Sequence, residues 1–446
     1  MRRYWTWLCA LLACGALIRL LLLTDYAPLS APDTQTYFSA ARDLLSGDFT
    51  ISQGRRTPGY PLFVAAMGES PSAIVIAQMA GGLLVSLLLF GLAVAMTGSA
   101  VLAFAVGLSY HLNLQQIFVE AALITEALST LGVVAVVSIL LPAMRRARAQ
   151  HKQPLVALGL GLLVGSVVLL RPQFIFLPLL VPALLLLAAM LGRPQTWRPK
   201  ATALGHAGLV AGAAATLLVG WSLVVWTKVG HFTMSTQAGF GLVNHSVRFV
   251  EYAPDRYATL REILLKHRQE RIAASGHSGN TIWYAWPEIR ERTGLSLPDA
   301  SRELQRMSVE LILAHPGRYA VSVAEAWVSF WTVPIIWNAE NLRPVWRSTL
   351  LPAVWAVEHK LLRLANLAFV LLVAAAAASS SVRRRLAWDM ELSAVSAVIL
   401  ASSLVQALAD QGAGSRYLIT TQSLVLLVLF VAAQRARRTP GRSLGP

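Results

Sequence analysis

The sequence has little charge and almost no cysteine. Asp, Glu, Lys and Arg make up 13% of its 446 residues, whereas 56% are hydrophobic. An ordinary soluble domain carries about 25% charged residues, so this composition excludes a typical water-soluble protein. Cys9 and Cys14 both lie in the first apolar run, which excludes a disulfide framework and a cysteine metal site. The chain also lacks a Walker A or GxGxxG sequence, so nothing in it predicts nucleotide binding.

The positive charge that the chain carries is gathered between apolar runs. Its formal net charge of +16 would by itself suit a nucleic acid. Basic clusters that flank apolar segments are instead typical of the cytoplasmic side of a membrane protein. They predict membrane lipids, and not nucleic acid, as partners. The clusters are Arg2 and Arg3; Arg145, Arg146, Arg148 and Lys152; Arg193, Arg198 and Lys200; Arg383, Arg384 and Arg385; and Arg435, Arg437, Arg438 and Arg442.

About ten apolar runs are long enough to cross a bilayer, whose apolar core needs about 20 helical residues. An even number of crossings places both termini and all the basic clusters on the cytoplasmic side of a bacterial inner membrane. The first run has the basic start of a signal peptide, but no small-x-small cleavage site follows, so we interpret it as a retained helix. We predict an all-α polytopic membrane protein. The runs are 4–23, 73–95, 101–118, 122–141, 154–170, 174–191, 201–226, 361–378, 392–408 and 418–433.

The segment 319–337 is apolar enough to span, but one additional crossing would place the Arg383 cluster outside. Either this segment lies in the membrane interface, as its three tryptophans favour, or it pairs with a second crossing near 350–357. Arg343 and Arg347 lie too close for a clean pair of crossings, so the interface is the better interpretation.

Two long polar loops face the outer, periplasmic side. In the first, Tyr37, Ala41 and Leu44 fall at helical spacing and Gly47 ends the pattern, which predicts a short amphipathic helix on the membrane surface. The second fits amphipathic helices near 257–273 and over 297–314. The predicted parts are a transmembrane module, 1–226, with its outer loop 24–72; an outer loop with amphipathic and interfacial helices, 227–360; transmembrane helices, 361–434; and a disordered cytoplasmic tail, 435–446.

The first outer loop and four later sites carry short motifs that lie on the outer side. Asp33 begins the predicted surface helix, and Arg56-Thr57-Pro58-Gly59-Tyr60-Pro61 precedes the next span. In this order and on this side, the motifs resemble the polyprenyl-phosphate-sugar-dependent glycosyltransferases of the GT-C fold, such as protein mannosyltransferases and the lipid A aminoarabinose transferase. The later motifs are Ile124-Thr125-Glu126, Leu170-Arg171-Pro172, Ala314-His315-Pro316-Gly317-Arg318-Tyr319 and Ser415-Arg416-Tyr417.

The resemblance implies a GT-C-like fold and an active site on the periplasmic face. The implied activity transfers one sugar, with inversion, from a polyprenyl-phosphate donor to a lipid, glycan or protein acceptor. The sequence gives no signal for a cofactor. His231, His245 and His277 lie at no metal-ligand spacing, so the sequence does not indicate a metal site, and a divalent metal stays an open alternative.

Two acids are the candidate catalytic residues. The resemblance implies that Asp33 deprotonates the acceptor hydroxyl, which is a poor nucleophile until a base removes its proton. The alternative is that Asp33 only caps the surface helix. Glu126 lies a few residues inside an apolar run, where an ionisable group is costly and often functional. Its alternative is snorkelling to the outer interface or bonding to a neighbouring helix. Glu120 is the weaker candidate, and His111 is a lone polar residue.

Three arginines and three tyrosines are the candidate substrate-binding residues. Arg56, Arg171 and Arg416 break the positive-inside pattern and could hold a phosphate that gains charge as it leaves. The alternative for each is a headgroup anchor. The tyrosines that could line a sugar pocket, or belong to an aromatic belt, are Tyr37, Tyr60 and Tyr417.

Two rival functions follow from the same features. A ligase or polymerase of lipid-linked glycans would also keep basic residues and a long loop outside. A lipid or sugar transporter would place polar residues near mid-membrane and show internal symmetry. The sequence shows no internal repeat and puts its polar candidates at one face, so the glycosyltransferase is the better prediction.

Overall fold

The computed structural model describes residues 2–192, 198–342, 345–412 and 414–438. In these ranges every regular element is a helix, and the extended pairs are the isolated bridges Tyr26–Leu342 and Leu29–Ala122. Eight helices are long and apolar enough to cross a membrane. The prediction of an all-α polytopic membrane protein is therefore confirmed. These helices are α1 (Arg2–Asp25), α4 (Pro71–Thr97), α7 (Glu126–Arg148), α9 (Leu177–Leu191, extended by the 3₁₀ turn η1, Pro172–Phe174), α10 (Arg198–Val229), α16 (Val345–Ala378), α18 (Met390–Ala409) and α19 (Gly414–Arg438).

Two of the predicted crossings are not among the eight long apolar helices. Helix α8 (Pro154–Leu170) has the predicted bounds but only 17 residues, and the run 101–118 is not one helix. It divides into α5 (Ala100–His111) and α6 (Leu114–Glu120), because Asn113 leaves helical geometry and its side chain accepts a hydrogen bond from the Gln116 amide. A 12-residue helix is about 18 Å long, which is less than the apolar thickness of a bilayer.

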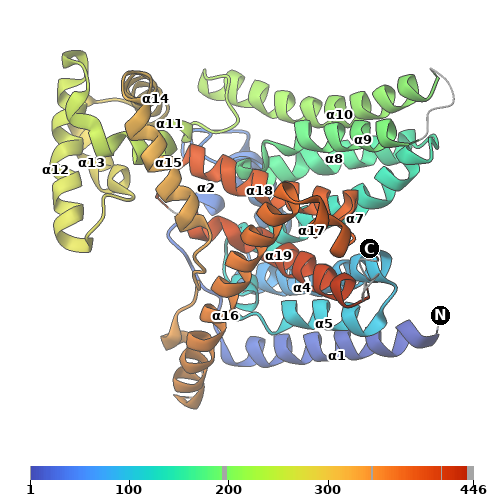
Figure 1. Ribbon diagram of the computed structural model, residues 1–446. Coiled ribbons are helices and arrows are strands. Elements are labelled where there is room, and N and C mark those ends of the chain that lie inside the picture. The colour runs from blue at the N-terminus through green and yellow to red at the C-terminus, as the bar shows by residue number, and fades with distance from the viewer. Residues whose placement is uncertain (1, 193–197, 343–344, 413, 439–446) are drawn as a thin grey trace.

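Most of the long helices run side by side, whereas α16 runs steeply across them, and the structure has two distinct ends (Figure 1). One end gathers the start of α1 and the ends of α4, α7 and α19. There Arg145 donates to the Ala95 carbonyl, Arg435 to the Ala387 carbonyl and Arg438 to the Thr97 carbonyl. These are members of the predicted cytoplasmic clusters; Arg193 and the tail beyond Arg438 lie outside the described residues. The basic clusters of α7 and α19 therefore share one end of the molecule.

The opposite end carries a small helical domain with its own apolar core (Figure 1). The predicted helices are present as α12 and α14, and the Ser296 side chain caps α14 by accepting from the Asp299 amide. The sequence analysis did not predict α11 or α13. The elements are α11 (Ala238–Ser246), the 3₁₀ turns η2 (Val247–Tyr252) and η3 (Asp255–Tyr257), α12 (Ala258–Ser275), α13 (Thr281–Thr293), α14 (Leu297–Ala314) and α15 (Pro316–Phe330).

The ambiguous segment 319–337 forms most of α15 and the turn that follows it. Helix α15 has 15 residues, about 22 Å of helix, and is not among the eight long apolar helices. It packs against α18, and the Trp327 indole N–H donates to Ser403 Oγ. After the 3₁₀ turn η4 (Ala339–Asn341), α16 already begins at Val345, inside the range 227–360. The short helix α17 (Ser380–Arg385) connects α16 to α18.

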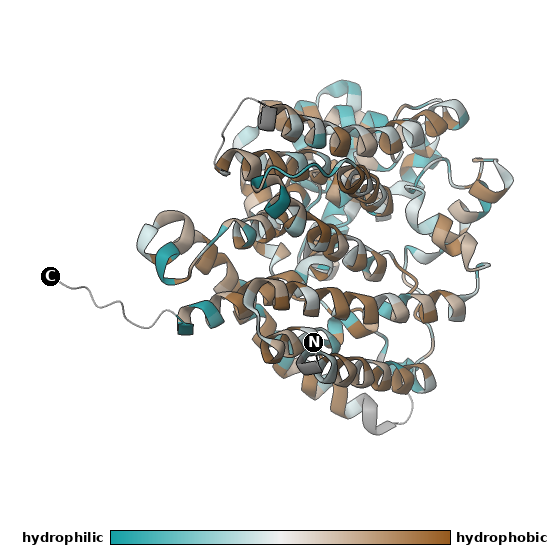
Figure 2. Ribbon diagram, turned by 90° about the vertical axis from the view of Figure 1, so that its right-hand side faces the viewer, coloured by the Kyte–Doolittle hydropathy of each residue, from teal (hydrophilic) through white to brown (hydrophobic). Residues whose placement is uncertain are grey.

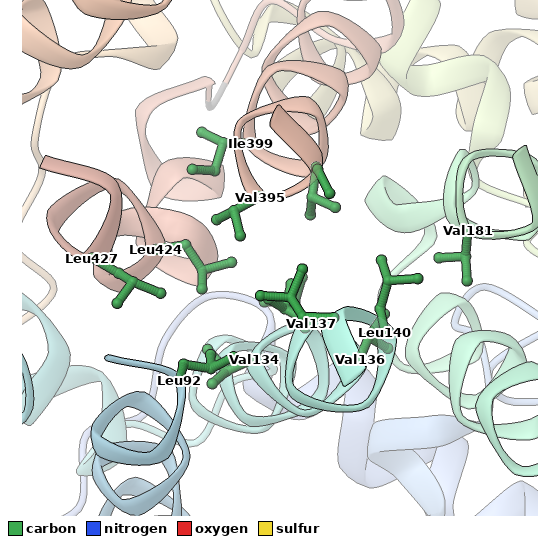
Figure 3. Close-up of a cluster of buried hydrophobic side chains, with 14 of the residues drawn as sticks. Leu92, Val134, Val136, Val137, Leu140, Val181, Val395, Ile399, Leu424 and Leu427 are labelled. Carbon is green, nitrogen blue, oxygen red and sulfur yellow. The ribbon is translucent and has the colours of Figure 1, made fainter. Parts of the chain in front are cut away.

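Helices α7 and α19 form the centre of the transmembrane part, whereas α1 and α16 lie at its edge. Two thirds of the α7 and α19 spans (67%) are buried, against 22% for α1 and α16. Figure 3 shows the core between α4, α7, α9, α18 and α19, where Val137, Val395 and Leu424 approach one another. Viewed from the end at which α1 begins, apolar residues also run along the outside of the long helices (Figure 2). This exterior suits lipid as the solvent.

Candidate functional site

At the end opposite the basic clusters of α7 and α19, the loop after α1 and the segment before α7 are hydrogen-bonded to each other. The Leu29 amide donates to the Ala121 carbonyl, and the Leu123 amide donates to the Leu29 carbonyl, each at 2.9 Å. The Thr34 hydroxyl adds a bond to the Leu123 carbonyl at 3.0 Å. These contacts place α2 (Thr34–Ser46) beside the start of α7. They bring Asp33 and Glu126, far apart in the sequence, into one cluster.

Asp33 uses its carboxylate to hold two arginines and not to cap α2. It occupies the N-cap position, but its side chain makes no capping hydrogen bond. Oδ1 accepts from Arg56 Nη2 at 2.5 Å and Oδ2 accepts from Arg416 Nη1 at 2.7 Å. Since both oxygens face guanidinium groups, the capping alternative does not describe this side chain.

Glu126 lies at the start of α7, is fully buried, and is held by two arginines as well. Arg171 Nη1 is 2.9 Å from Oε1, and Arg416 Nε donates to the same oxygen. Arg171 also donates to the Thr125 hydroxyl at 2.9 Å. Arg416 therefore bridges the two acids, with one nitrogen on each. The snorkelling alternative does not fit a carboxylate with no exposed surface, whereas the alternative of bonding to a neighbouring helix describes its contact with Arg416 of α19.

The structure brings two of the three candidate tyrosines to the cluster. The Arg56 guanidinium lies 4.6 Å from the Tyr37 ring centre, and that of Arg171 lies 4.4 Å from the Tyr417 ring centre. Such contacts attract a cation to the ring face and fix its orientation. Tyr60, on α3 (Gly59–Ala66), is different. It is completely buried behind Tyr37, and its hydroxyl donates to Gln78 Oε1 at 3.0 Å.

The cluster forms one wall of a cavity of about 340 Å³. Asp33, Tyr37, Arg56, Arg171, Arg416 and Tyr417 line it, whereas Tyr60 does not. Further lining residues that the sequence analysis missed are Arg55, Gln173 and Asp410. The sequence held a signal for each of them. Arg55 and Gln173 lie within two residues of Arg56 and Arg171 in the sequence, and Asp410 interrupts the apolar pattern at the end of α18.

The charges around the cavity do not cancel. Four arginines, Arg55, Arg56, Arg171 and Arg416, meet three carboxylates, those of Asp33, Glu126 and Asp410, so the ionised site keeps one net positive charge. This excess, in a partly buried site, favours an anionic ligand.

Outside the membrane-spanning helices, several groups of the site have shifted pKa values. Burial opposes ionisation of Asp33, but the guanidinium groups of Arg56 and Arg416 outweigh it and hold its pKa below the usual range. Burial and the neighbouring Arg56 lower the pKa of Arg55 to about 10. Burial raises the pKa of Asp410, which accepts from Asn244 and the Gly412 amide and faces no arginine. Asp33 is therefore a poor base until its arginines are drawn away.

In the described part of the chain, no group of three or more His, Cys, Asp or Glu side chains gathers as a set of metal ligands. The oxygens of Asp33 are already occupied by guanidinium groups. The arrangement is suited to holding a phosphate by bidentate arginine contacts.

A second buried cluster lies between α1, α5 and α6. Arg19 donates to both Glu120 oxygens, at 2.8 and 2.6 Å, and Tyr110 donates to one of them at 2.9 Å. Arg19 Nη1 also lies 3.0 Å from His111 Nδ1, so His111 is not the lone polar residue that the sequence suggested. None of these four side chains lines the cavity of the Asp33 cluster.

A larger cavity, of about 720 Å³, lies between the small helical domain and the turn after α18. Its arginines are paired with acids: Arg268 Nη1 lies 2.7 Å from Glu251, and Arg248 forms an ion pair with Glu325. Because this charge is already balanced, the smaller arginine-rich cavity is the better candidate site.

Comparison of the chain with protein-family models, curated proteins and solved structures finds no significant match.

Proposed function

We propose that this protein is a glycosyltransferase that moves a sugar from a polyprenyl-phosphate donor to a lipid, glycan or protein acceptor. The observation that carries the proposal is the joining of Asp33 and the buried Glu126 by Arg416. Asp33 and Arg416, with Arg56 and Arg171 beside them, line a cavity with excess positive charge. This arrangement lies at the end opposite the basic clusters of α7 and α19. The GT-C resemblance supplies the reaction class.

The arginines suit the leaving group of this reaction. A phosphodiester donor carries one negative charge, and the polyprenyl phosphate that leaves gains a second as its bond to the sugar breaks. Fixed guanidinium groups stabilise that developing charge, and each such donor contributes about 10²–10³ in rate in well-studied sites. Arg171 and Arg416 are buried or partly buried and are already oriented by Glu126. They need little rearrangement to face a phosphate.

Asp33 takes the role of base once the donor is bound. At rest Arg56 and Arg416 hold it ionised with a lowered pKa, which makes it weakly basic. A phosphate that recruits the same guanidinium groups weakens their hold on Asp33 and raises its basicity. The acceptor oxygen then bonds to the anomeric carbon, the bond from that carbon to the phosphate oxygen breaks, and the acceptor proton passes to Asp33. Glu126 keeps Arg171 and Arg416 in place.

The rival functions differ from this one in what the site does to the donor. A transporter would bind its ligand and break no bond, and transporter sites usually lie near mid-membrane. Here the cluster lies where α7 begins and α8 ends, at one end of the helices. A ligase or polymerase of lipid-linked glycans shares this geometry and differs in its donor.

Transfer by the purified full-length protein tests the proposal. The protein in detergent is given a panel of polyprenyl-phosphate sugars and a lipid and glycan extract as acceptor, and release of polyprenyl phosphate is followed. The expected result is release with at least one sugar, which stops when Arg416 is changed to Ala. Movement of the intact donor across the membrane of proteoliposomes, with no release of polyprenyl phosphate, would contradict the glycosyltransferase and support the transporter.

The location of the site is part of the proposal. We place the cavity on the periplasmic side of a bacterial inner membrane, with both termini cytoplasmic, because basic clusters are retained in the cytoplasm. In a variant without Cys9 and Cys14, single cysteines at Gln53 and Gly279 should react with a membrane-impermeant reagent in spheroplasts. Labelling at Gln150 in place of these positions would invert the topology.

A further inference from the structure

The cavity of the Asp33 cluster has a second wall with a different character. Helix α18 presents Ser402 and Gln406 four residues apart on a single face, and Asp410 follows directly as the C-cap residue, where the backbone is extended. Gln406 and Asp410 line the cavity, and Ser402 holds the side chain of Gln173, which lines it too. No arginine is bound to any of these four residues in the described part of the chain.

The orientation of the Gln173 amide is fixed by its neighbours. Its nitrogen donates to Ser402 Oγ at 2.5 Å and to the Tyr417 carbonyl at 3.2 Å. A carbonyl can only accept, so the nitrogen must face Tyr417 and the oxygen must face away from it. Gln173 is 6% exposed, and its Oε1 has no hydrogen-bond partner among the described residues. A buried acceptor without a donor is unfavourable, so this atom points to a ligand that supplies one.

Asp410 also has accepting capacity left. Its Oδ1 accepts from Asn244 Nδ2 at 2.7 Å and from the Gly412 amide at 2.8 Å, which holds the turn after α18. No described residue donates to its second oxygen. The second wall therefore offers two acceptors, Gln173 Oε1 and Asp410 Oδ2, whereas the arginine wall offers donors.

We propose that Gln173 and Asp410 form the subsite for the transferred sugar, which they recognise as an uncharged, hydroxyl-bearing ring through its O–H donors. Sugar hydroxyls are donors that complete such acceptors, and a charged acceptor such as Asp410 forms the stronger bond. An ammonium-bearing sugar is disfavoured, because the four arginines around the same cavity leave it with net positive charge. This assignment rests on the proposed function for the identity of the ligand.

Two probes separate the sugar subsite from the phosphate site. Decaprenyl phosphate tests the arginine wall, and an alkyl hexoside without phosphate tests the second wall. Binding of each to the full-length protein in nanodiscs is measured by calorimetry. Asp410→Asn keeps both bonds to Oδ1 and removes only the free carboxylate oxygen, and Gln173→Leu removes the free acceptor. Each change should weaken hexoside binding about tenfold, the effect of one hydrogen bond, and should not weaken decaprenyl phosphate binding.

The matched controls are Asn244→Ala and Ser402→Ala, which remove a bond that holds Asp410 or Gln173 but leave the two acceptor oxygens in place. They should weaken hexoside binding less than the variants that they accompany. Equal hexoside affinity in the wild type, Asp410→Asn and Gln173→Leu would overturn the subsite, as would tighter binding of the corresponding hexosaminide at neutral pH. Failure of the wild type to bind decaprenyl phosphate would instead contradict the proposed function, and the hexoside result would still decide the subsite.

Discussion

The structure buries charge in two places, and the two clusters are balanced differently. In the cluster between α1, α5 and α6, one arginine meets one glutamate through two hydrogen bonds, and Tyr110 and His111 complete the set. Two glycines make room for it: a Cβ on Gly82 would lie 1.9 Å from Glu120 Oε1, and one on Gly15 would lie 2.4 Å from the His111 ring. This cluster is closed, with little unused bonding capacity.

The Asp33 cluster is open. Three arginines share the two acids Asp33 and Glu126. Asp33 and these arginines line a cavity, to which Arg55 adds a further positive charge, whereas Glu126 is buried and does not line it. Both clusters contain buried ionisable groups, which within a membrane are usually taken as a sign of function. Burial alone therefore does not select one of the two clusters as the site. The excess charge beside an accessible cavity favours the Asp33 cluster.

The largest expected effect is a loss of stability without a loss of transfer, on mutation of the cluster between α1, α5 and α6. Glu120→Ala leaves Arg19 buried without its partner, which costs about 3–5 kcal/mol in comparable buried pairs. Thermal unfolding in detergent should show this loss, and transfer per folded molecule should stay close to the wild type. The matched control Arg19→Met with Glu120→Gln removes both charges and should recover most of the stability. A Glu120→Ala protein with normal stability and no transfer would contradict this prediction and would mean that Glu120 belongs to the catalytic site.

The next effect concerns the arginine that joins the two acids. Arg416 places Nε on Glu126 and Nη1 on Asp33, and a single lysine nitrogen cannot reproduce that fork. Arg416→Lys should lower single-turnover transfer at saturating donor by about 10²–10³. The same change at Arg56 and Arg171 shows how the phosphate contact is divided. Wild-type rates for all three lysine variants would mean that the arginines are headgroup anchors.

A somewhat smaller loss is expected at Asp33. Asp33→Asn preserves the shape of the side chain and removes its charge, so transfer should fall by about 10² as a general base is lost. The pKa of Asp33 is lowered in the folded protein, so its ionised form stabilises the fold above the unfolded pKa of about 4, and this contribution disappears as the pH falls through the folded value. The stability difference between wild type and Asp33→Asn should therefore be largest near neutral pH and shrink below about pH 4. Normal transfer by the variant would mean that Asp33 is not the general base.

The smallest effect tests the segment that carries Glu126. Gln78 Nε2 donates to the Glu120 and Ala122 carbonyls, at 2.9 and 2.8 Å, and Tyr60 donates to its Oε1. Tyr60→Phe removes one hydrogen bond, worth about 1 kcal/mol, and should reduce stability by that amount with a few-fold loss of transfer. The donor affinity should not change, because Tyr60 does not line the cavity. A large loss of donor affinity would instead mean that Tyr60 contacts the sugar donor.

The local pattern of the sequence was enough for several elements of the fold. Helix α14 begins after Ser296 and ends before Pro316, because a side-chain cap and a missing backbone N–H act within a few residues. Helix α2 ends at Gly47, whose φ of 70° is a conformation that glycine adopts without strain. The break inside 101–118 was missed, since the apolar run continues across it and only the Asn113 cap interrupts the helix.

The sequence by itself determined that the chain crosses a membrane and which segments form the apolar helices. It also predicted that Asp33, Glu126 and three arginines lie toward the same side of that membrane. These properties depend on composition and on spacing along a single helix. Only the tertiary structure decided which charges meet: Arg416 bridges acids that precede it by hundreds of residues, Glu120 pairs with Arg19, and Tyr60 turns away from the cavity to Gln78. Ion pairs and cavities depend on distances between helices, and helix packing sets those distances without leaving a local sequence pattern.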